Sequence, residues 1–209
     1  MTKKISFFVF AFLAIGIGLY PLLYVIIDTT FGLLDSKAPE LLNSTLWNVA
    51  FYTHIFLGGL ALLTGWSQFS GKIRRKYLLL HRRLGMIYCI CVLFSGSASL
   101  YIGYYATGGL IPAAGFISLG LIWLTSTGLA FNAIMDKRIL IHQKWMIVSF
   151  AACFAAVTLR IWLPLLTSAF GDFLPAYKIV AWLCWVPNLI FAYFVLKKKG
   201  LLAIPDPGS

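Results

Sequence analysis

The fold class is decided by long uncharged stretches, of which the clearest is LGMIYCICVLFSGSASLYIGYY, residues 84–105. A helix needs about 20 apolar residues to cross a hydrocarbon core of about 30 Å, and this stretch is longer than that. The residues just before it, His81-Arg82-Arg83, are basic. An apolar run that follows a basic cluster is typical of a membrane-spanning helix that begins at the cytoplasmic face.

Five further runs of the same kind flank this stretch, so the sequence predicts an all-α bundle of six transmembrane helices. Only 11% of the residues are charged, against about 25% in a soluble domain. A cytosolic enzyme, a disordered chain and a secreted disulfide scaffold are therefore excluded. We expect one transmembrane domain, 1–209, with helices at 5–27, 47–69, 84–105, 111–135, 145–166 and 177–196, a functional core at 47–166 and a short disordered cytoplasmic tail at 200–209.

The positive charges predict the orientation of these helices. The chain has 17 Lys and Arg against 6 Asp and Glu, and all the cations except Lys37, Arg160 and Lys178 fall on one side of the predicted spans. The positive-inside rule then places both termini in the cytoplasm, as expected for a multi-pass protein of a bacterial inner membrane. Because the cations form short clusters between apolar runs, we expect lipid and not nucleic acid as their partner.

Two histidines at matching positions predict a site near the cytoplasmic face. The segments KYLLLHRR (76–83) and KRILIHQK (137–144) align without a gap and place His81 and His142 at one depth. Two neutral imidazoles on neighbouring helices can bind a haem iron from both sides, with the propionates beside cations. Those cations are Arg82, Arg83 and Lys144. The alternative is that both histidines bond loop carbonyls and lipid phosphates at the interface.

His54 and Arg160 predict a second site, in the outer half of the bundle. A rise of about 1.5 Å per residue puts the two at similar depths. An arginine inside a span is costly and usually marks function, although a side chain that snorkels to the interface is the alternative. We expect Tyr101 and Asn188 to accept hydrogen bonds from Arg160. Since no span holds an Asp or Glu to neutralise it, an anionic or carbonyl-bearing ligand such as a quinone is expected.

Residues and motifs that the sequence lacks disfavour several further classes of function. Spans without a carboxylate disfavour an ion-coupled carrier. The chain has no metalloprotease, serine-hydrolase or phosphate-loop motif, and its cysteines, Cys89, Cys91, Cys153 and Cys184, form no Cys-x-x-Cys pair. The leading hypothesis is a small electron-transfer protein with b-type haem or a quinone. The alternatives are a carrier or binder of an anionic amphiphile without redox chemistry, and a structural subunit of a membrane complex. Whether the protein is an enzyme stays open.

Several segments together carry a resemblance to a known family: His54, Gly58, Gly65, Gln68, 81–88, Trp123, 142–146 and 155–160. The sequence is similar to a family of predicted bacterial membrane proteins, the domain-of-unknown-function family numbered 2306, over about residues 50–165. The resemblance implies a polytopic membrane protein and singles out His54, His81, His142 and Arg160, but it carries no established activity. This sequence departs from the family pattern at Gly65-Trp66-Ser67 and at Gln143.

Overall fold

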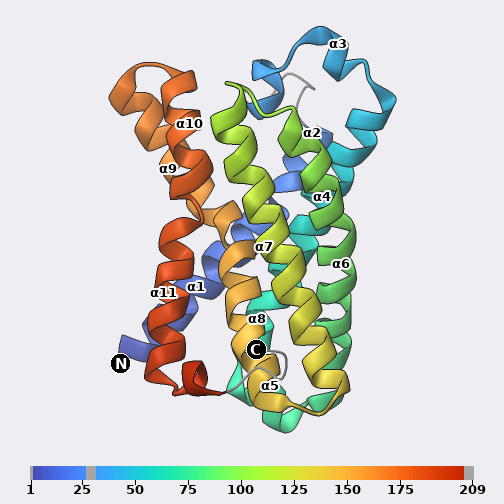
Figure 1. Cartoon of the computed structure of the whole chain (residues 1–209), viewed down its shortest axis with the longest axis vertical. Helices are drawn as coiled ribbons and strands as arrows, with labels where there is room; N and C mark the ends of the chain where they lie inside the picture. The colour runs from blue at the N-terminus through green and yellow to red at the C-terminus, as the bar shows by residue number, and fades with distance from the viewer. Residues whose placement is uncertain (1, 27–31, 205–209) are drawn as a thin grey trace.

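The protein is a bundle of membrane-length helices, seen in a computed structural model that describes residues 2–26 and 32–204 (Figure 1). Within these residues there is no strand, and six helical segments are long and apolar enough to cross a membrane. The predicted fold class is thus confirmed. The elements are α1 (Thr2–Leu19), η1 (Tyr20–Leu22), α2 (Leu23–Ile26), η2 (Gly32–Ser36), α3 (Pro39–Leu42), α4 (Thr45–Gly65), η3 (Trp66–Phe69), α5 (Gly71–Lys76), α6 (Leu78–Tyr104), α7 (Leu110–Met135), α8 (Ile139–Cys153), α9 (Ala155–Phe170), α10 (Phe173–Leu183), α11 (Val186–Lys198) and η4 (Leu201–Ala203).

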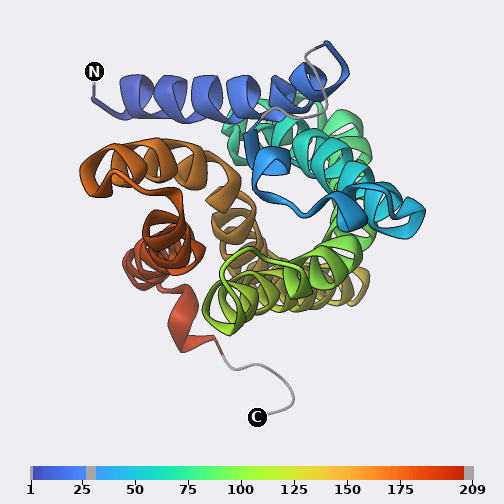
Figure 2. The ribbon, with the colours of Figure 1, turned by 90° about the horizontal axis from the view of Figure 1, so that it is seen from above.

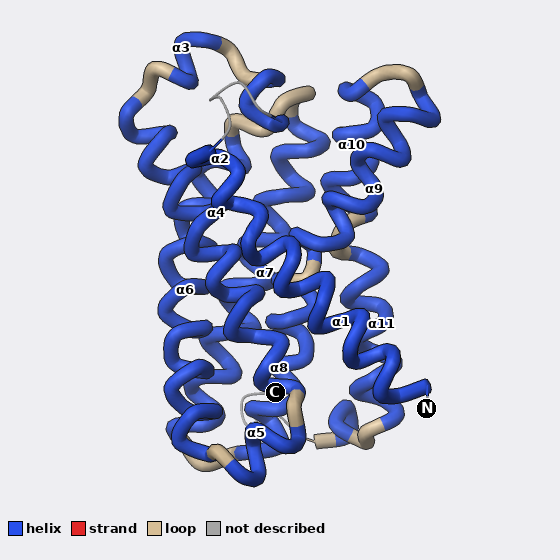
Figure 3. The backbone as a smooth tube through the Cα atoms, turned by 180° about the vertical axis from the view of Figure 1, so that it is seen from behind, coloured by secondary structure: helices blue, strands red, loops and turns tan. Residues whose placement is uncertain are grey.

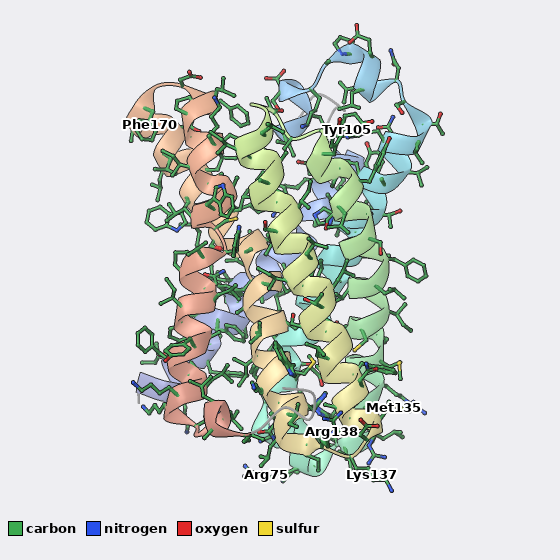
Figure 4. The ribbon with its side chains drawn as sticks, viewed as in Figure 1. Arg75, Tyr105, Met135, Lys137, Arg138 and Phe170 are labelled. Carbon is green, nitrogen blue, oxygen red and sulfur yellow. The ribbon has the colours of Figure 1, made fainter. Side chains whose placement is uncertain are left out.

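Most of the cations gather at one end of the bundle, which we call the basic end. It carries α5, the turn between α7 and α8, the first turns of α1 and the last turns of α11 (Figures 1 and 4). Arg75, Lys137 and Arg138 lie there, whereas Tyr105 and Phe170 lie at the opposite, distal end (Figure 4). This separation agrees with the charge pattern of the sequence. That the basic end faces the cytoplasm stays a prediction.

Two helices begin about two turns earlier than the sequence predicted. The third starts at Leu78 and the fifth at Ile139, so His81 and His142 lie within the first turns of α6 and α8. Helical hydrogen bonding continues through the interface because charged side chains there reach water while the backbone stays paired. At the other boundaries, position 27 of the first predicted helix and positions 205–209 of the predicted tail lie outside the described residues. Leu201 is buried in η4, so that part of the tail is folded.

The fifth and sixth spans are each broken into two helices at a similar height, a feature that the apolar pattern did not reveal. Pro187 at the start of α11 lacks an N–H and separates that helix from α10. No proline accompanies the break at Phe154 between α8 and α9. There, the Asn188 amide donates to Ala151 O at 3.3 Å and to Cys184 O at 3.0 Å, and thereby satisfies carbonyls at both breaks. The two breaks are thus paired through Asn188.

The core is a ring of four helices packed through small residues. α6 packs against α4 and α7, and α8 packs against the same two helices, so α6 and α8 face each other across the ring. Gly58 and Gly65 on α4 receive Ser95 and Tyr88 of α6: a Cβ at Gly65 would lie 2.9 Å from the Tyr88 ring. Small residues allow this close approach of backbones in membranes. Figure 2 shows α1 outside the ring, along one side of the molecule, where it contacts α4 and α9.

The distal end is capped by η2, which the tube in Figure 3 shows near the α6–α7 turn. Leu34 is only 3% exposed, among Tyr24, Trp47 and Phe51. Lys37 Nζ, one residue after η2, donates to Tyr105 O at 2.6 Å and to Thr107 Oγ1 at 3.1 Å. These bonds fasten the segment before α3 to the turn after α6.

Candidate functional site

His54 is held on α4 by a reciprocal pair of contacts with Ser95 on α6. Its Nδ1 lies 3.1 Å from Ser95 O, and Ser95 Oγ donates to His54 O at 2.9 Å. A carbonyl oxygen only accepts, so Nδ1 carries the proton and Nε2 keeps a lone pair. The ring is enclosed by protein, yet part of its surface is accessible. His54 therefore has a fixed orientation and keeps Nε2 as an acceptor nitrogen.

Arg160 projects from α9 to the aromatic residues that follow α1. Its Nη1 donates to Ala156 O at 2.9 Å, and its guanidinium carbon lies 4.4 Å from the centre of the Tyr20 ring. Its Nε is buried without a hydrogen-bond partner among the described residues. The one ion pair in that part of the chain is Arg138–Asp136, at the basic end. The Ala156 carbonyl and the nearby Tyr20 and Tyr24 are neutral groups, so the Arg160 charge meets no carboxylate among the described residues and its Nε keeps unused donor capacity.

A chain of rings extends from Tyr20 and forms the wall beside Arg160. Tyr20 meets Tyr24 at 6.0 Å between ring centres, Tyr24 meets Phe51 at 5.6 Å, and Phe51 stacks on Trp47 at 5.0 Å. Trp47 is 1% exposed and its Nε1 has no partner within the described chain. Sequence reasoning missed these rings because aromatic residues are common in apolar runs. The signal was their density within 20–24 and 47–52.

The structure brings some of the predicted outer-site residues together and not others. Arg160 is close enough to His54 to act on it electrostatically. Tyr101 instead pairs with Tyr105, at 5.3 Å between ring centres. Asn188 is used at the helix breaks and donates to Thr158 Oγ1 at 3.1 Å. Neither is among the partners found for Arg160. We call His54, Ser95, Arg160 and Tyr20 the distal site.

The two other histidines face each other across the ring at the basic end. His142 Nδ1 lies 2.9 Å from Ala130 O, which fixes the proton on Nδ1 and leaves Nε2 as an acceptor. His81 Nδ1 is buried and unpartnered within the described residues. The two imidazoles are close enough to interact electrostatically, and Arg82 and Arg74 also lie near His81. Arg74 comes from α5 and was not predicted.

The cations predicted beside the histidine pair are only partly directed to it. Arg82 and Arg83 are both exposed. Lys144 Nζ lies 5.5 Å from the centre of the Trp145 ring. A positively charged rim therefore surrounds the pair, and Arg82 and Arg74 are the cations that act on His81. The roles of Arg82, Arg83 and Lys144 as partners of propionates stay predictions.

Four buried polar side chains form a network between the two sites, which we call the central network. Trp123 Nε1 donates to Tyr88 Oη at 3.1 Å, Tyr88 Oη lies 2.7 Å from Ser149 Oγ, and Ser149 Oγ lies 2.6 Å from Thr127 Oγ1. Thr127 Oγ1 donates back to Trp123 O at 2.7 Å. Every donor is used once and the circuit closes on the same tryptophan. A signal existed in the sequence: His81, Tyr88 and Ser95 recur every seven residues, as do His142 and Ser149.

The comparison with known proteins agrees with the predicted resemblance and extends it. Residues 51–196 match the model of a family described as "Predicted membrane protein (DUF2306)". The match continues beyond the resemblance at 50–165 to include α10 and almost all of α11. No curated protein and no solved structure matches the chain. Because the matched region covers more than half of the sequence and contains His54, His81, His142 and Arg160, the chain belongs to this family of predicted membrane proteins.

Proposed function

We propose that the distal site binds an amphiphile whose head group carries a carboxylate or a carbonyl, such as a fatty acid or a quinone. The observation that supports this is Arg160, a largely buried guanidinium whose Nε has no partner and whose charge meets no carboxylate among residues 2–26 and 32–204. Leaving such a group uncompensated is expensive, and a bound acceptor oxygen removes the cost. The protein is thereby a ligand-binding protein of a bacterial inner membrane.

The surroundings of Arg160 fit the two parts of such a ligand. Charge-assisted bonds from a guanidinium are short and strong, and its planar fork suits a carboxylate or a pair of carbonyl oxygens. A flat ring would stack against the wall that begins at Tyr20. The cap formed by Leu34 and Lys37 covers the distal end, so an apolar tail has its natural place in the bilayer.

The test uses purified protein in nanodiscs with three probes: decanoate, ubiquinone-1 and decanol. We expect decanoate or ubiquinone-1, and not decanol, to raise the midpoint of thermal unfolding and to bind in calorimetry. Arg160→Gln should weaken binding by about tenfold to a hundredfold, as expected for loss of a hydrogen bond to a charged group. Arg160→Lys should not restore it, because Lys lacks the planar fork.

Arg83→Gln is the matched control, because it removes an exposed arginine at the basic end. It should leave binding unchanged. If neither probe binds, or if Arg160→Gln binds as well as the wild type, the ligand hypothesis is wrong and Arg160 has a structural role.

A second function is favoured by the histidine pair: binding of one b-type haem, which would make the protein an electron carrier. The supporting observation is the bond between His142 Nδ1 and Ala130 O, since metal-binding histidines commonly donate the other ring N–H to a carbonyl. His81 lies across the ring with an unpartnered Nδ1. A bound haem would supply one-electron chemistry, and a quinone at the distal site would be its partner.

An absorption spectrum of the purified protein tests the haem hypothesis. If haem is bound, a Soret band is present and sharp α and β bands develop on reduction. His81→Ala and His142→Ala should each abolish them, whereas His54→Ala should not. A colourless protein that takes up no haemin would leave amphiphile binding without redox chemistry as the function.

A further inference from the structure

A groove runs along the basic end between the first half of α1 and the segment that joins α4 to α5. It consists of two adjoining hollows of about 330 and 350 Å³ that share Lys4 and Phe7. The first hollow continues over Ser70 and Gly71, and the second continues along α1 to Phe12. It therefore has a polar end and an apolar end, and it lies outside both sites described above.

The apolar end is built from aromatic side chains that face away from the core. Phe8 is 69% exposed and Phe12 is 66% exposed, and their rings stack at 6.4 Å between centres. Phe7 meets Trp66 at 6.1 Å and forms the inner wall. Exposed apolar surface next to a concave wall is suited to a hydrocarbon chain that lies along the helix.

The polar end carries positive charge with no carboxylate to balance it. Lys4 borders both hollows. The Arg75 guanidinium turns back over Gly71, where Nη2 lies 3.7 Å from the position that a Cβ would take. Among the described residues the only ion pair is formed by Arg138 and Asp136, so neither Lys4 nor Arg75 has an acidic partner in that part of the chain. The positive charge at this end of the groove favours binding of an anion.

We propose that this groove binds one anionic phospholipid, with its phosphate between Lys4 and Arg75 and an acyl chain along Phe8, Phe12 and Trp66. Charge complementarity decides the class of lipid, because a zwitterionic head group would place a cation beside two unpaired cations. The size and the polar-to-apolar order of the groove match a lipid head followed by a chain. This inference does not rest on ligand binding at Arg160 or on haem.

The experiment is native mass spectrometry of the full protein released from detergent with equal amounts of phosphatidylglycerol and phosphatidylcholine of the same chains. We expect the wild type to retain phosphatidylglycerol preferentially. The double variant Lys4→Gln and Arg75→Gln should reduce that preference by about tenfold, since each basic residue near an anionic membrane surface contributes a several-fold effect. Phe12→Ser should reduce retention of both lipids.

The control is the double variant Lys198→Gln and Lys199→Gln, which removes the same charge from exposed positions at the same end. It should keep the preference. Equal retention of the two lipids by the wild type would overturn the proposal, and so would an equal loss in both double variants, because the attraction would then belong to the whole basic end. Circular dichroism and size-exclusion chromatography establish that each variant is folded before lipids are compared.

Discussion

The central network and the distal site both lie within the spans, but they differ in how completely their buried polar groups are hydrogen-bonded. In the central network, Trp123, Tyr88, Ser149 and Thr127 satisfy one another in a closed circuit. In the distal site, the Arg160 charge meets the Ala156 carbonyl and two neutral tyrosines, Tyr20 and Tyr24, and its Nε has no partner among the described residues. A satisfied network rigidifies a core, whereas the unused donor in the distal site is the basis of our proposal that a ligand binds there.

Tyr88→Phe is expected to have the largest effect, because it opens the closed circuit. The change leaves Trp123 Nε1 without an acceptor and Ser149 without a donor in a buried place. We expect a loss of about 1–3 kcal/mol in the free energy of unfolding, measured by denaturant titration in mixed micelles. Tyr104→Phe, at a side chain that is 72% exposed, is the control and should change stability by less than about 0.5 kcal/mol.

Arg160→Met should act in the opposite direction on the ligand-free protein. It replaces an uncompensated buried cation by an apolar side chain of similar length, so unfolding should become harder by up to about 2 kcal/mol. The same titration measures it, with the exposed Arg83→Met as the control. A clear loss of stability would show that the bonds to Ala156 and Tyr20 already compensate the charge, and the contrast between the two regions would disappear.

Two of the buried tryptophans, Trp47 and Trp123, give a smaller and matched test. Trp47 Nε1 has no partner in the described chain, while Trp123 Nε1 donates to Tyr88. Both Trp→Phe changes lose apolar area, but only the change at Trp123 also breaks a hydrogen bond. We expect Trp123→Phe to be the more destabilising by about 1 kcal/mol. Equal losses would mean that the orphaned donor at Trp47 finds water.

The smallest expected effect concerns Lys37 in the cap, whose contribution to the free energy of unfolding depends on pH. Partial burial lowers the pKa of Lys37 from 10.5 to about 8. The folded protein then binds fewer protons than the unfolded chain between about pH 8 and 10.5, so the contribution of this residue to stability rises with pH across that window. NMR of dimethylated lysines should show one resonance that titrates near pH 8, absent in Lys37→Gln. If all lysines titrate near 10.5, the cap is open in solution.

The sequence was sufficient to predict the membrane-spanning helices, but it did not reveal where the fifth and sixth spans are interrupted. Apolar runs of the necessary length identify spans because the bilayer requires every backbone group to be paired within the segment. No proline accompanies the break at Phe154, and the amide that donates to Ala151 O beside it belongs to Asn188 of the next span. A side chain that supplies a hydrogen bond from another helix leaves no trace in periodicity.

The same distinction applies to the candidate sites. Arg160 and the histidines stood out because such residues are rare in apolar runs, so their identity alone marked them. Their partners did not stand out. Tyr20 and Trp47 look like any other aromatic residue of a span, and Asn188 and Tyr101 looked suitable for Arg160 although they bond elsewhere. The depth of a residue in the membrane follows from its position along one helix, whereas its hydrogen-bond partners depend on how the helices pack against one another.

The position of Tyr20 has a consequence for how specificity can change within the family. Arg160 lies inside the region that matches the family model, residues 51–196, whereas the ring that covers its guanidinium comes from η1, before that region. The charge and the surface that shapes access to it are thus carried by separable parts of the polypeptide. If Arg160 binds the proposed ligand, a relative with another segment in place of η1 and α2 would keep the arginine but surround it with different side chains. Exchange of this segment would then change which ligand is preferred without disturbing the four-helix ring.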